Sequence, residues 1–172
     1  MLFRSETGHV FQIMPDKQWR RVVASPRPHR FVEEDALREV IDAGHVVIAA
    51  GGGGVPVVEV GDTLRGVEAV VDKDRSAALL ARLIRADALL ILTAVARVEV
   101  HFGTPQAQPV ERLTLREARS LLELGEFPEG SMGPKIEACC DFIVGGGQRA
   151  VIASLHQASE ALFGGAGTTI MP

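Results

Sequence analysis

Three short apolar segments place the strongest limit on what this chain can fold into. They are residues 45–50 (HVVIAA), 88–95 (ALLILTAV) and 150–155 (AVIASL), and none contains Asp, Glu, Lys or Arg. Strands that are apolar throughout are typical of a sheet covered on both faces. Segments of helical period precede them, at residues 31–43, 72–87 and 135–144. This alternation predicts an α/β fold with right-handed crossovers and a mainly parallel sheet, in which the three apolar segments are adjacent central strands.

Shorter patterns fill the rest of the chain. Residues 55–60 and 64–71 predict a β-hairpin with its turn at Gly61 and Asp62. Further predicted elements are strands at 20–24 and 98–102, helices at 114–124 and 157–163, and an edge strand at 168–171. The start of the chain lacks a regular pattern. We therefore expect an irregular segment over residues 1–18, followed by one domain over residues 19–172.

Composition excludes several classes of protein. The chain has 172 residues, of which 47% are hydrophobic, and a net charge of −4. This length supports one domain with a sizeable core, and the balance excludes a disordered chain. No net positive charge points to nucleic acid, and no apolar run is long enough to cross a bilayer. No signal-peptide pattern is visible, so we expect a cytoplasmic protein. Cys139 and Cys140 are adjacent in the sequence and lie outside any metal-binding spacing.

A run of four glycines follows the first apolar segment. Gly51, Gly52, Gly53 and Gly54 would let the backbone approach a ligand closely and turn its N–H groups toward an anion. A tight turn between a strand and a hairpin explains the same residues without any ligand. The run matches neither GxGxxG nor GxxxxGK[ST], so the dinucleotide and P-loop fingerprints are absent.

Two lysines stand at predicted helix starts. Lys73 lies between Asp72 and Asp74, where a lysine held by a carboxylate could meet phosphate oxygens. Two helix-capping acids around a solvated lysine are the simpler interpretation. Lys135 follows Gly130, Ser131, Met132, Gly133 and Pro134, and a lysine in a first helical turn opposes the helix dipole. A bound phosphate would resolve that conflict, whereas an ordinary loop with a lysine facing water is the alternative.

Six segments together resemble the carbamate kinases of the amino acid kinase family. They are QWRRVVASPRP, VVIAAGGGGVPVV, GVEAVVDKD, LLILT, GSMGPKIEA and GTTIMP, in the order and spacing of that family. The resemblance runs from Trp19 to Pro172. It implies a three-layer αβα fold, a carbamate kinase-like nucleotide-binding domain, and the reaction ATP + carbamate ⇌ ADP + carbamoyl phosphate. It also implies Mg²⁺ with ATP or ADP, a homodimer, and a place in arginine breakdown.

The resemblance assigns roles to individual residues. Lys73 and Lys135 would neutralise the transferred phosphoryl group, and Asp74 would hold both lysines in position, so that all three face one cleft. The four glycines at 51–54 would line the cleft near carbamate. Further residues would border the nucleotide, namely Thr93, Val95, Gly130, Ser131, Met132 and Gly133. No metal ligand is assigned to the chain itself.

Two departures from the family pattern leave three hypotheses open. Family members are about twice as long, and nothing before Trp19 resembles their glycine-asparagine loop, which holds the transferred phosphate. Ala94 stands where the family pattern LTDV has aspartate. The chain is therefore a truncated carbamate kinase, a non-catalytic nucleotide-binding remnant, or one subunit of a split kinase. Its partner is correspondingly a second copy of the chain or a missing N-terminal half.

Overall fold

A four-stranded sheet forms the centre of the computed structural model, which describes residues 2–5, 8–14, 17–128 and 130–172. Its strands, in spatial order, are β6 (Ala88–Thr93), β10 (Arg149–Ser154), β11 (Thr168–Met171) and β9 (Arg112–Thr114). β6 and β10 are parallel and adjacent, as predicted. β11 runs antiparallel to β10 and parallel to β9. The sheet is therefore mixed rather than mainly parallel, and β11 lies inside it rather than at the predicted edge.

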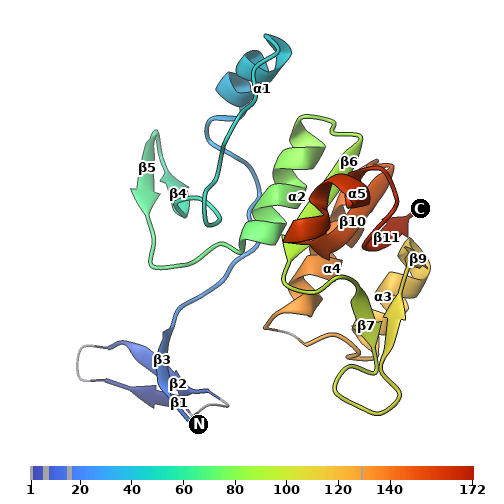
Figure 1. Cartoon of the computed structure of the whole chain (residues 1–172). Helices are drawn as coiled ribbons and strands as arrows, with labels where there is room; N and C mark the ends of the chain where they lie inside the picture. Colours follow the sequence, from blue (N-terminus) through green and yellow to red (C-terminus); the bar gives the residue numbers. More distant parts are fainter. Residues whose placement is uncertain (1, 6–7, 15–16, 129) are drawn as a thin grey trace.

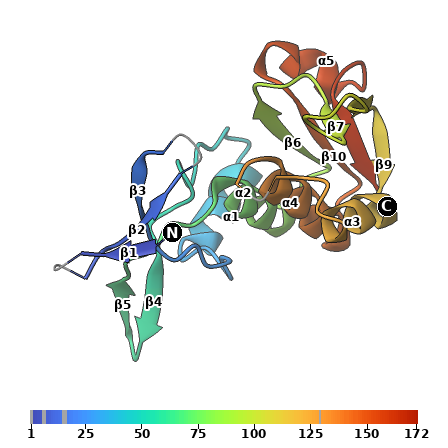
Figure 2. The ribbon, with the colours of Figure 1, turned by 90° about the horizontal axis from the view of Figure 1, so that it is seen from below.

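Helices cover both faces of this sheet, which confirms the three-layer α/β architecture. α2 (Lys73–Leu83), α3 (Leu115–Glu123) and α4 (Met132–Val144) lie on one side, and α5 (Ala158–Leu162) lies on the other (Figure 2). The buried side chains of the sheet belong to two separate cores, because successive side chains of a strand point to opposite faces. Ile152 belongs to the large core with the first three helices, whereas Val151 and Ala153 belong to the smaller core beneath α5.

Local sequence explains where the helices begin. The Asp72 carboxylate accepts hydrogen bonds from the N–H groups of Asp74 (2.9 Å) and Arg75 (3.1 Å), which caps α2. Thr114 and Glu117 form a capping box at the start of α3. α4 begins at Met132, three residues before the predicted start. Pro134 fits there because residues in a first turn need no intrahelical N–H donor.

The N-terminal part of the chain extends away from this core (Figure 1). β1 (Leu2–Arg4), β2 (Val10–Ile13) and β3 (Trp19–Val22) form an antiparallel sheet. The expectation of irregular structure before residue 19 is therefore wrong for the described residues, since β2 pairs directly with β3. The predicted domain of residues 19–172 remains a prediction. α1 (Glu34–Asp42) and the hairpin of β4 (Val57–Val60) and β5 (Thr63–Gly66) are present as predicted, although β5 ends five residues before the predicted position 71. Gly61 has the positive φ (58°) that such a turn requires.

Residues 45–50 do not form the predicted central strand. The structure assigns them no strand pairing, and Val46 and Ile48 are 96% and 98% exposed. Within the part of the chain that the structure describes, the sheet ends at β6 and no strand pairs with this segment. An apolar sequence forms a stable strand only when a second strand satisfies its backbone groups.

A second hairpin packs against the end of the main sheet. β7 (Val98–Val100) pairs with β8 (Gln108–Val110), and the β7 strand is the predicted one at 98–102 shortened by two residues. The buried Thr168 hydroxyl accepts a hydrogen bond from the N–H of Val98 (2.9 Å) and donates one to the carbonyl of Val110. Thr168 thereby fixes the hairpin to β11. Among the described helices, none combines the length and apolar character needed to cross a membrane.

Candidate active site

Chain direction brings two helix starts to the same edge of the sheet. α2 leads into β6 and α4 leads into β10 through short connections, so each helix runs back along its strand. The N-termini of α2 and α4 therefore lie near the carboxyl ends of β6 and β10. Ligands of open α/β sheets bind at this edge.

Asp74 and Lys135 meet between these two helices. The Lys135 Nζ donates a hydrogen bond of 2.6 Å to Asp74 Oδ2, although the residues are 61 positions apart in the sequence. Only 9% of the Asp74 side chain and 14% of the Lys135 side chain are exposed. A charge-assisted contact of this length, shielded from water, is among the stronger polar interactions. Asp74 also suits the positive end of the α2 dipole, and it offsets the unfavourable position of Lys135 in the first turn of α4.

Lys73 lies beside this pair but is not part of it. It is the first residue of α2 and its side chain is exposed. In the ranges that the structure describes, Lys73 makes no ion pair, whereas Asp74 is paired with Lys135. The structure thus brings two of the three predicted catalytic residues into contact. That Lys73 faces the same cleft stays a prediction.

The turn formed by residues 51–54, which we call the glycine turn, contacts the start of α2. A Cβ atom on Gly53 would lie 2.1 Å from the carbonyl oxygen of Val71, and Gly53 has φ +133°, so only glycine fits. The buried Ser76 hydroxyl donates a hydrogen bond of 2.7 Å to the Gly53 carbonyl. Gly51, Gly52 and Gly54 are exposed on this turn. The turn therefore lies directly against the helix that carries Lys73 and Asp74.

The loop before α4 uses some of its own N–H groups. The carbonyl of Pro128 accepts hydrogen bonds from Ser131 (3.2 Å) and Gly133 (2.9 Å). Gly133 is buried, and a Cβ atom there would lie 3.2 Å from that same carbonyl. These two N–H groups are therefore not available to a bound anion. Gly130 and Ser131 are exposed, and Met132 is half-buried.

A pocket of about 570 Å³ opens near the carboxyl ends of β6 and β10. Val95 is the predicted nucleotide residue that lines it, and Thr93 lies at the end of β6 opposite Ser154. The other lining residues are Ala96, Arg97, Glu99, Pro109, Gln157, Gly165, Ala166 and Gly167. The sequence analysis missed this wall of the pocket. The glycine-rich stretch at 164–167, which follows a short helix, was the available signal.

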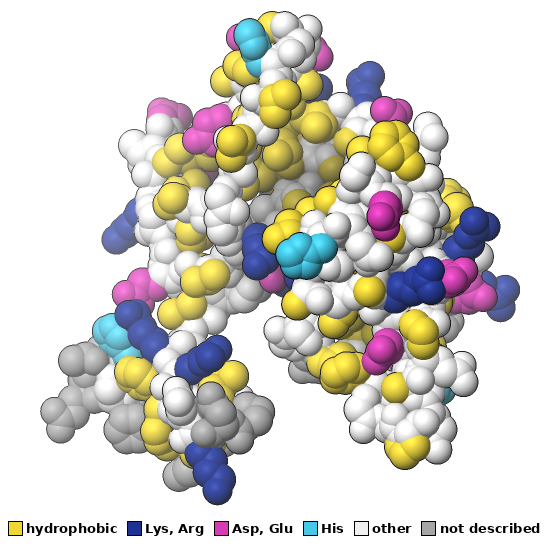
Figure 3. Space-filling model, viewed as in Figure 1, with side chains coloured by type: hydrophobic (Ala, Val, Ile, Leu, Met, Phe, Trp, Pro, Cys, Tyr) yellow, Lys and Arg dark blue, Asp and Glu magenta, His cyan; other side chains and the backbone are white. Residues whose placement is uncertain are grey.

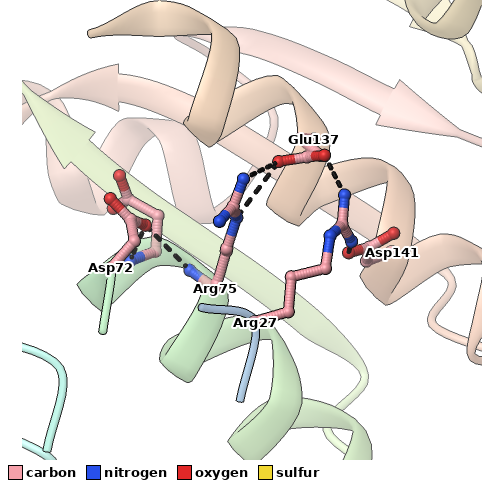
Figure 4. Close-up of polar contacts among 6 residues, drawn as sticks. Arg27, Asp72, Arg75, Glu137 and Asp141 are labelled. Carbon is pink, nitrogen blue, oxygen red and sulfur yellow. Dashed lines mark hydrogen bonds and ion pairs between the residues drawn. The ribbon is translucent and has the colours of Figure 1, made fainter. Parts of the chain in front are cut away.

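A chain of ion pairs joins α2, α4 and the segment after β3, and sequence analysis also missed it (Figure 4). Arg75 Nη2 lies 2.7 Å from Glu137 Oε2, so α2 and α4 share a second ion pair beside that of Asp74 and Lys135. Arg27 contacts the other oxygen of Glu137 and lies 2.8 Å from Asp141 Oδ2. No local pattern marks these residues, because their partners are up to 114 positions away.

The two cysteines lie on the core side of α4 and are free thiols. Burial raises the pKa of Cys139 far above its ordinary value, and the adjacent Cys140 adds to the effect. Burial likewise raises the pKa of Cys140 to about 11. Thiolates are the reactive form of cysteine, so neither side chain is suited to act as a nucleophile.

Known proteins are similar to this chain in sequence and in fold. Residues 5–154 match the model of the amino acid kinase family. A carbamate kinase of Halobacterium salinarum is 51% identical over 154 residues, which cover 90% of this chain and 50% of that protein. A carbamate kinase of Clostridium perfringens is 48% identical over 167 residues, covering 96% and 53%.

Comparison with solved structures also finds carbamate kinases, here through similarity of the fold. The carbamate kinase of Giardia lamblia bound to AMP-PNP superposes with a TM-score of 0.89 at 37% identity, over 96% of this chain and 52% of that one. The chain thus spans about half the length of the relatives it matches. Since the family model covers most of its residues, the chain belongs to the amino acid kinase family.

Proposed function

We propose that this chain carries the phosphate-binding part of a carbamate kinase-like phosphotransferase, for the reaction ATP + carbamate ⇌ ADP + carbamoyl phosphate. The observation that supports it most is the shielded Asp74–Lys135 pair at the starts of two helices. The identity to carbamate kinases supports the choice of substrate. The use of basic residues adds to the argument: only three of the 18 Lys and Arg residues are lysines, and two of these are Lys73 and Lys135.

In the proposed reaction the side chains position and neutralise charge. Phosphoryl transfer needs little covalent chemistry from a protein, because its transition state spreads negative charge over oxygen atoms. The Lys135 ammonium would bind those oxygens, and Asp74 would keep Nζ directed into the site. Lys73 would add a second positive charge from the exposed start of α2. The glycine turn at 51–54 would let the backbone approach the carbamate side.

We propose that the nucleotide lies between the Thr93–Val95 turn and the start of α4. The position at the carboxyl edge of the sheet supports this placement. Binding is expected to be weak, because Ala94 replaces the family's aspartate. Mg²⁺ would shield the phosphate charges. Among the described residues no three His, Cys, Asp or Glu side chains are grouped to hold a metal. The ion would therefore be bound mainly through nucleotide phosphates.

A second candidate is a nucleotide-binding protein without catalytic turnover. Ala94, which replaces the family's aspartate, favours it over an active enzyme. A subunit of a split kinase is a third candidate. The homodimeric state, the cytoplasmic location and the link to arginine breakdown also stay predictions.

An ATP-formation assay tests the proposal. The purified chain is given carbamoyl phosphate and MgADP, alone and together with the half of the Halobacterium salinarum relative that it does not match. ATP formation that is lost in Lys135→Met and kept in Lys17→Met would support the proposed activity. Lys17 is the matched control because it is an exposed lysine far from the site in the chain. Nucleotide binding without ATP formation in either mixture would instead favour the non-catalytic protein.

A further inference from the structure

A hydrogen bond joins two parts of the candidate site that are distant in the sequence. The Ser76 hydroxyl donates to the carbonyl oxygen of Gly53 over 2.7 Å, although the two residues are 23 positions apart. Only 1% of Ser76 is exposed, and Gly53 is buried as well. The bond is separate from the cap of α2 and from the ion pair that Asp74 makes with Lys135.

Ser76 does not use its hydroxyl within its own helix. Serine side chains inside a helix commonly bond to the carbonyl one turn earlier. In α2 that carbonyl, of Asp72, accepts the backbone N–H of Ser76 at 3.0 Å, and the hydroxyl bonds to the glycine turn. The side chain of Ser76 therefore makes a contact between two elements and not one within the helix.

A second contact holds the glycine turn nearer the start of the helix. The backbone of Gly53 lies so close to the Val71 carbonyl oxygen that a Cβ atom would be 2.1 Å from it, and 3.4 Å from the Lys73 nitrogen. Val71 precedes the helix and Ser76 is its fourth residue, so the turn is attached on both sides of Lys73. Two points of attachment restrain the orientation of the turn as well as its distance from α2.

Two N–H groups of the glycine turn have no partner in the described ranges of the chain. Those of Gly51 and Gly53 are bonded to carbonyls of the preceding segment, at 2.8 Å each. Those of Gly52 and Gly54 have no acceptor there, and both glycines are exposed. Figure 3 shows the surface hollowed between the part that carries β4 and β5, into which the turn leads, and the part that carries α2 and α5.

We infer that Ser76 is a positioning residue, which holds the glycine turn where its free N–H groups meet the carbamoyl part of the substrate while the lysines bind the phosphate part. The inference rests on the proposed function, from which it takes the substrate. A carbamoyl group is oriented by backbone donors at fixed positions, whereas a phosphate is bound by lysine chiefly through charge. Ser76 would therefore decide how well the site distinguishes carbamoyl phosphate from a simple phosphate, and would touch neither ligand.

A pair of stable phosphonates tests this role. Phosphonoacetamide has a methylene in place of the bridging oxygen of carbamoyl phosphate, and methylphosphonate lacks the carboxamide. The full chain, isotopically labelled for NMR spectroscopy, is titrated with each compound, and the amide signals of the glycine turn and of Lys73 are followed. Wild type should bind phosphonoacetamide more tightly by at least about fivefold. In Ser76→Ala this ratio of affinities should fall below about twofold, while the affinity for methylphosphonate should stay within about twofold of wild type.

Two further variants separate positioning from stability. Ser120→Ala is the matched control, because Ser120 is an exposed serine within α3, and it should keep the wild-type ratio. Ser76→Cys retains a side chain of similar shape with a weaker donor, so its ratio should lie between those of wild type and Ser76→Ala. It also carries the test if Ser76→Ala does not fold. A loss of stability alone would lower the thermal midpoint but leave the ratio unchanged, because both compounds bind the same folded chain.

Failure of this inference can be told from failure of the proposed function. Equal ratios in wild type and Ser76→Ala would overturn the inference, and so would a wild type without preference for phosphonoacetamide. Catalysis is measured separately, as ATP formation. A preference that depends on Ser76 in a chain that makes no ATP would refute catalysis and leave the positioning role standing. ATP formation with the same KM for carbamoyl phosphate in wild type and Ser76→Ala would support catalysis and overturn the role of Ser76.

Discussion

At the scale of single residues, the position of Asp74 distinguishes two ideas about anion binding. It is the buried partner of Lys135, with 2.6 Å between Oδ2 and Nζ. If its role is to orient the lysine, Asp74→Ala should weaken binding of carbamoyl phosphate or sulfate by roughly tenfold, even though a negative charge is removed. Calorimetric titration of the variant with either anion measures this effect.

Net charge alone makes the opposite prediction, namely tighter anion binding in Asp74→Ala. Asp87→Ala is a suitable control, because Asp87 is exposed and follows the other end of α2. It removes the same charge without touching Lys135, and the affinity should stay within about twofold, as expected of a screened surface charge. Tighter binding in Asp74→Ala would contradict the orienting role.

Gly53 carries the second prediction at this scale. In Gly53→Ala the new methyl would collide with the Val71 carbonyl, at 2.1 Å, in a backbone conformation that L-residues rarely adopt. We expect a loss of more than about 2 kcal/mol in the free energy of unfolding. Urea denaturation measures it.

Gly52→Ala is the matched control for that change. A Cβ atom at Gly52 has no heavy atom within 4 Å, and its φ is not positive. The free energy of unfolding should change by less than about 1 kcal/mol in Gly52→Ala, within the range of ordinary glycine substitutions. Equal losses in both variants would mean that the contact between the glycine turn and α2 is unimportant.

The site could be predicted only where residues carry a local signal. The sequence offered Asp72 and Asp74 as caps of the following helix, and the structure shows that Asp72 is the cap. Proximity of Asp74 and Lys135 came from the family resemblance, since nothing local connects residues 61 positions apart. Ser76 and Glu137 were missed because a serine or glutamate in a helix has many possible roles until its tertiary neighbours are known.

At the scale of elements, α2 and α4 are joined by ion pairs of opposite polarity. Asp74 on α2 meets Lys135 on α4, and Arg75 on α2 meets Glu137 on α4. Glu137 also contacts Arg27, which is half exposed and lies in the segment after β3. Glu137→Gln should therefore lower the free energy of unfolding by only about 0.5–1 kcal/mol. Its larger effect should be faster tryptic cleavage at the Arg30–Phe31 bond of the same segment, since the bond after Arg27 precedes a proline and resists trypsin.

Glu123→Gln is the control, because Glu123 is an exposed acid at the end of α3. Both variants lose one negative charge, so a general charge effect would act on both. Salt should reduce the difference between wild type and Glu137→Gln, since partly exposed ion pairs are screened. Equal cleavage rates in the two variants would show that Glu137 does not hold the segment.

Elements stabilised by their own sequence were predicted well, and those that need a distant partner were not. α1, α2, α3 and the β4–β5 hairpin follow from period, caps and turn residues. Segment 45–50 has an equally clear strand sequence but forms no strand, because a strand requires a neighbour as well as a composition. The order of the sheet was misjudged for the same reason. β11 pairs with β9 on its outer side, and no local feature of 168–171 indicates that pairing.

At the scale of the whole molecule, apolar burial is concentrated in one part of the chain. The buried hydrophobic residues of the described structure run from Val71 onward, and none precedes it. The β1–β3 sheet, α1 and segment 45–50 thus contribute no buried apolar side chain, so hydrophobic stabilisation comes mainly from the part around β6, β10 and α4.

Native-state hydrogen exchange of the full chain should reflect this division. Amides of β10 and α4 should exchange most slowly, because their exposure requires opening of the main core. Those of β2, β3 and residues 46–50 should exchange faster by at least about two orders of magnitude, since local opening there exposes little apolar surface. The paired strands β4 and β5 show how much protection strand hydrogen bonds give without burial, because they have ladder hydrogen bonds but no buried side chain. Uniform protection across the chain would contradict the prediction and would mean that the N-terminal part unfolds together with the core.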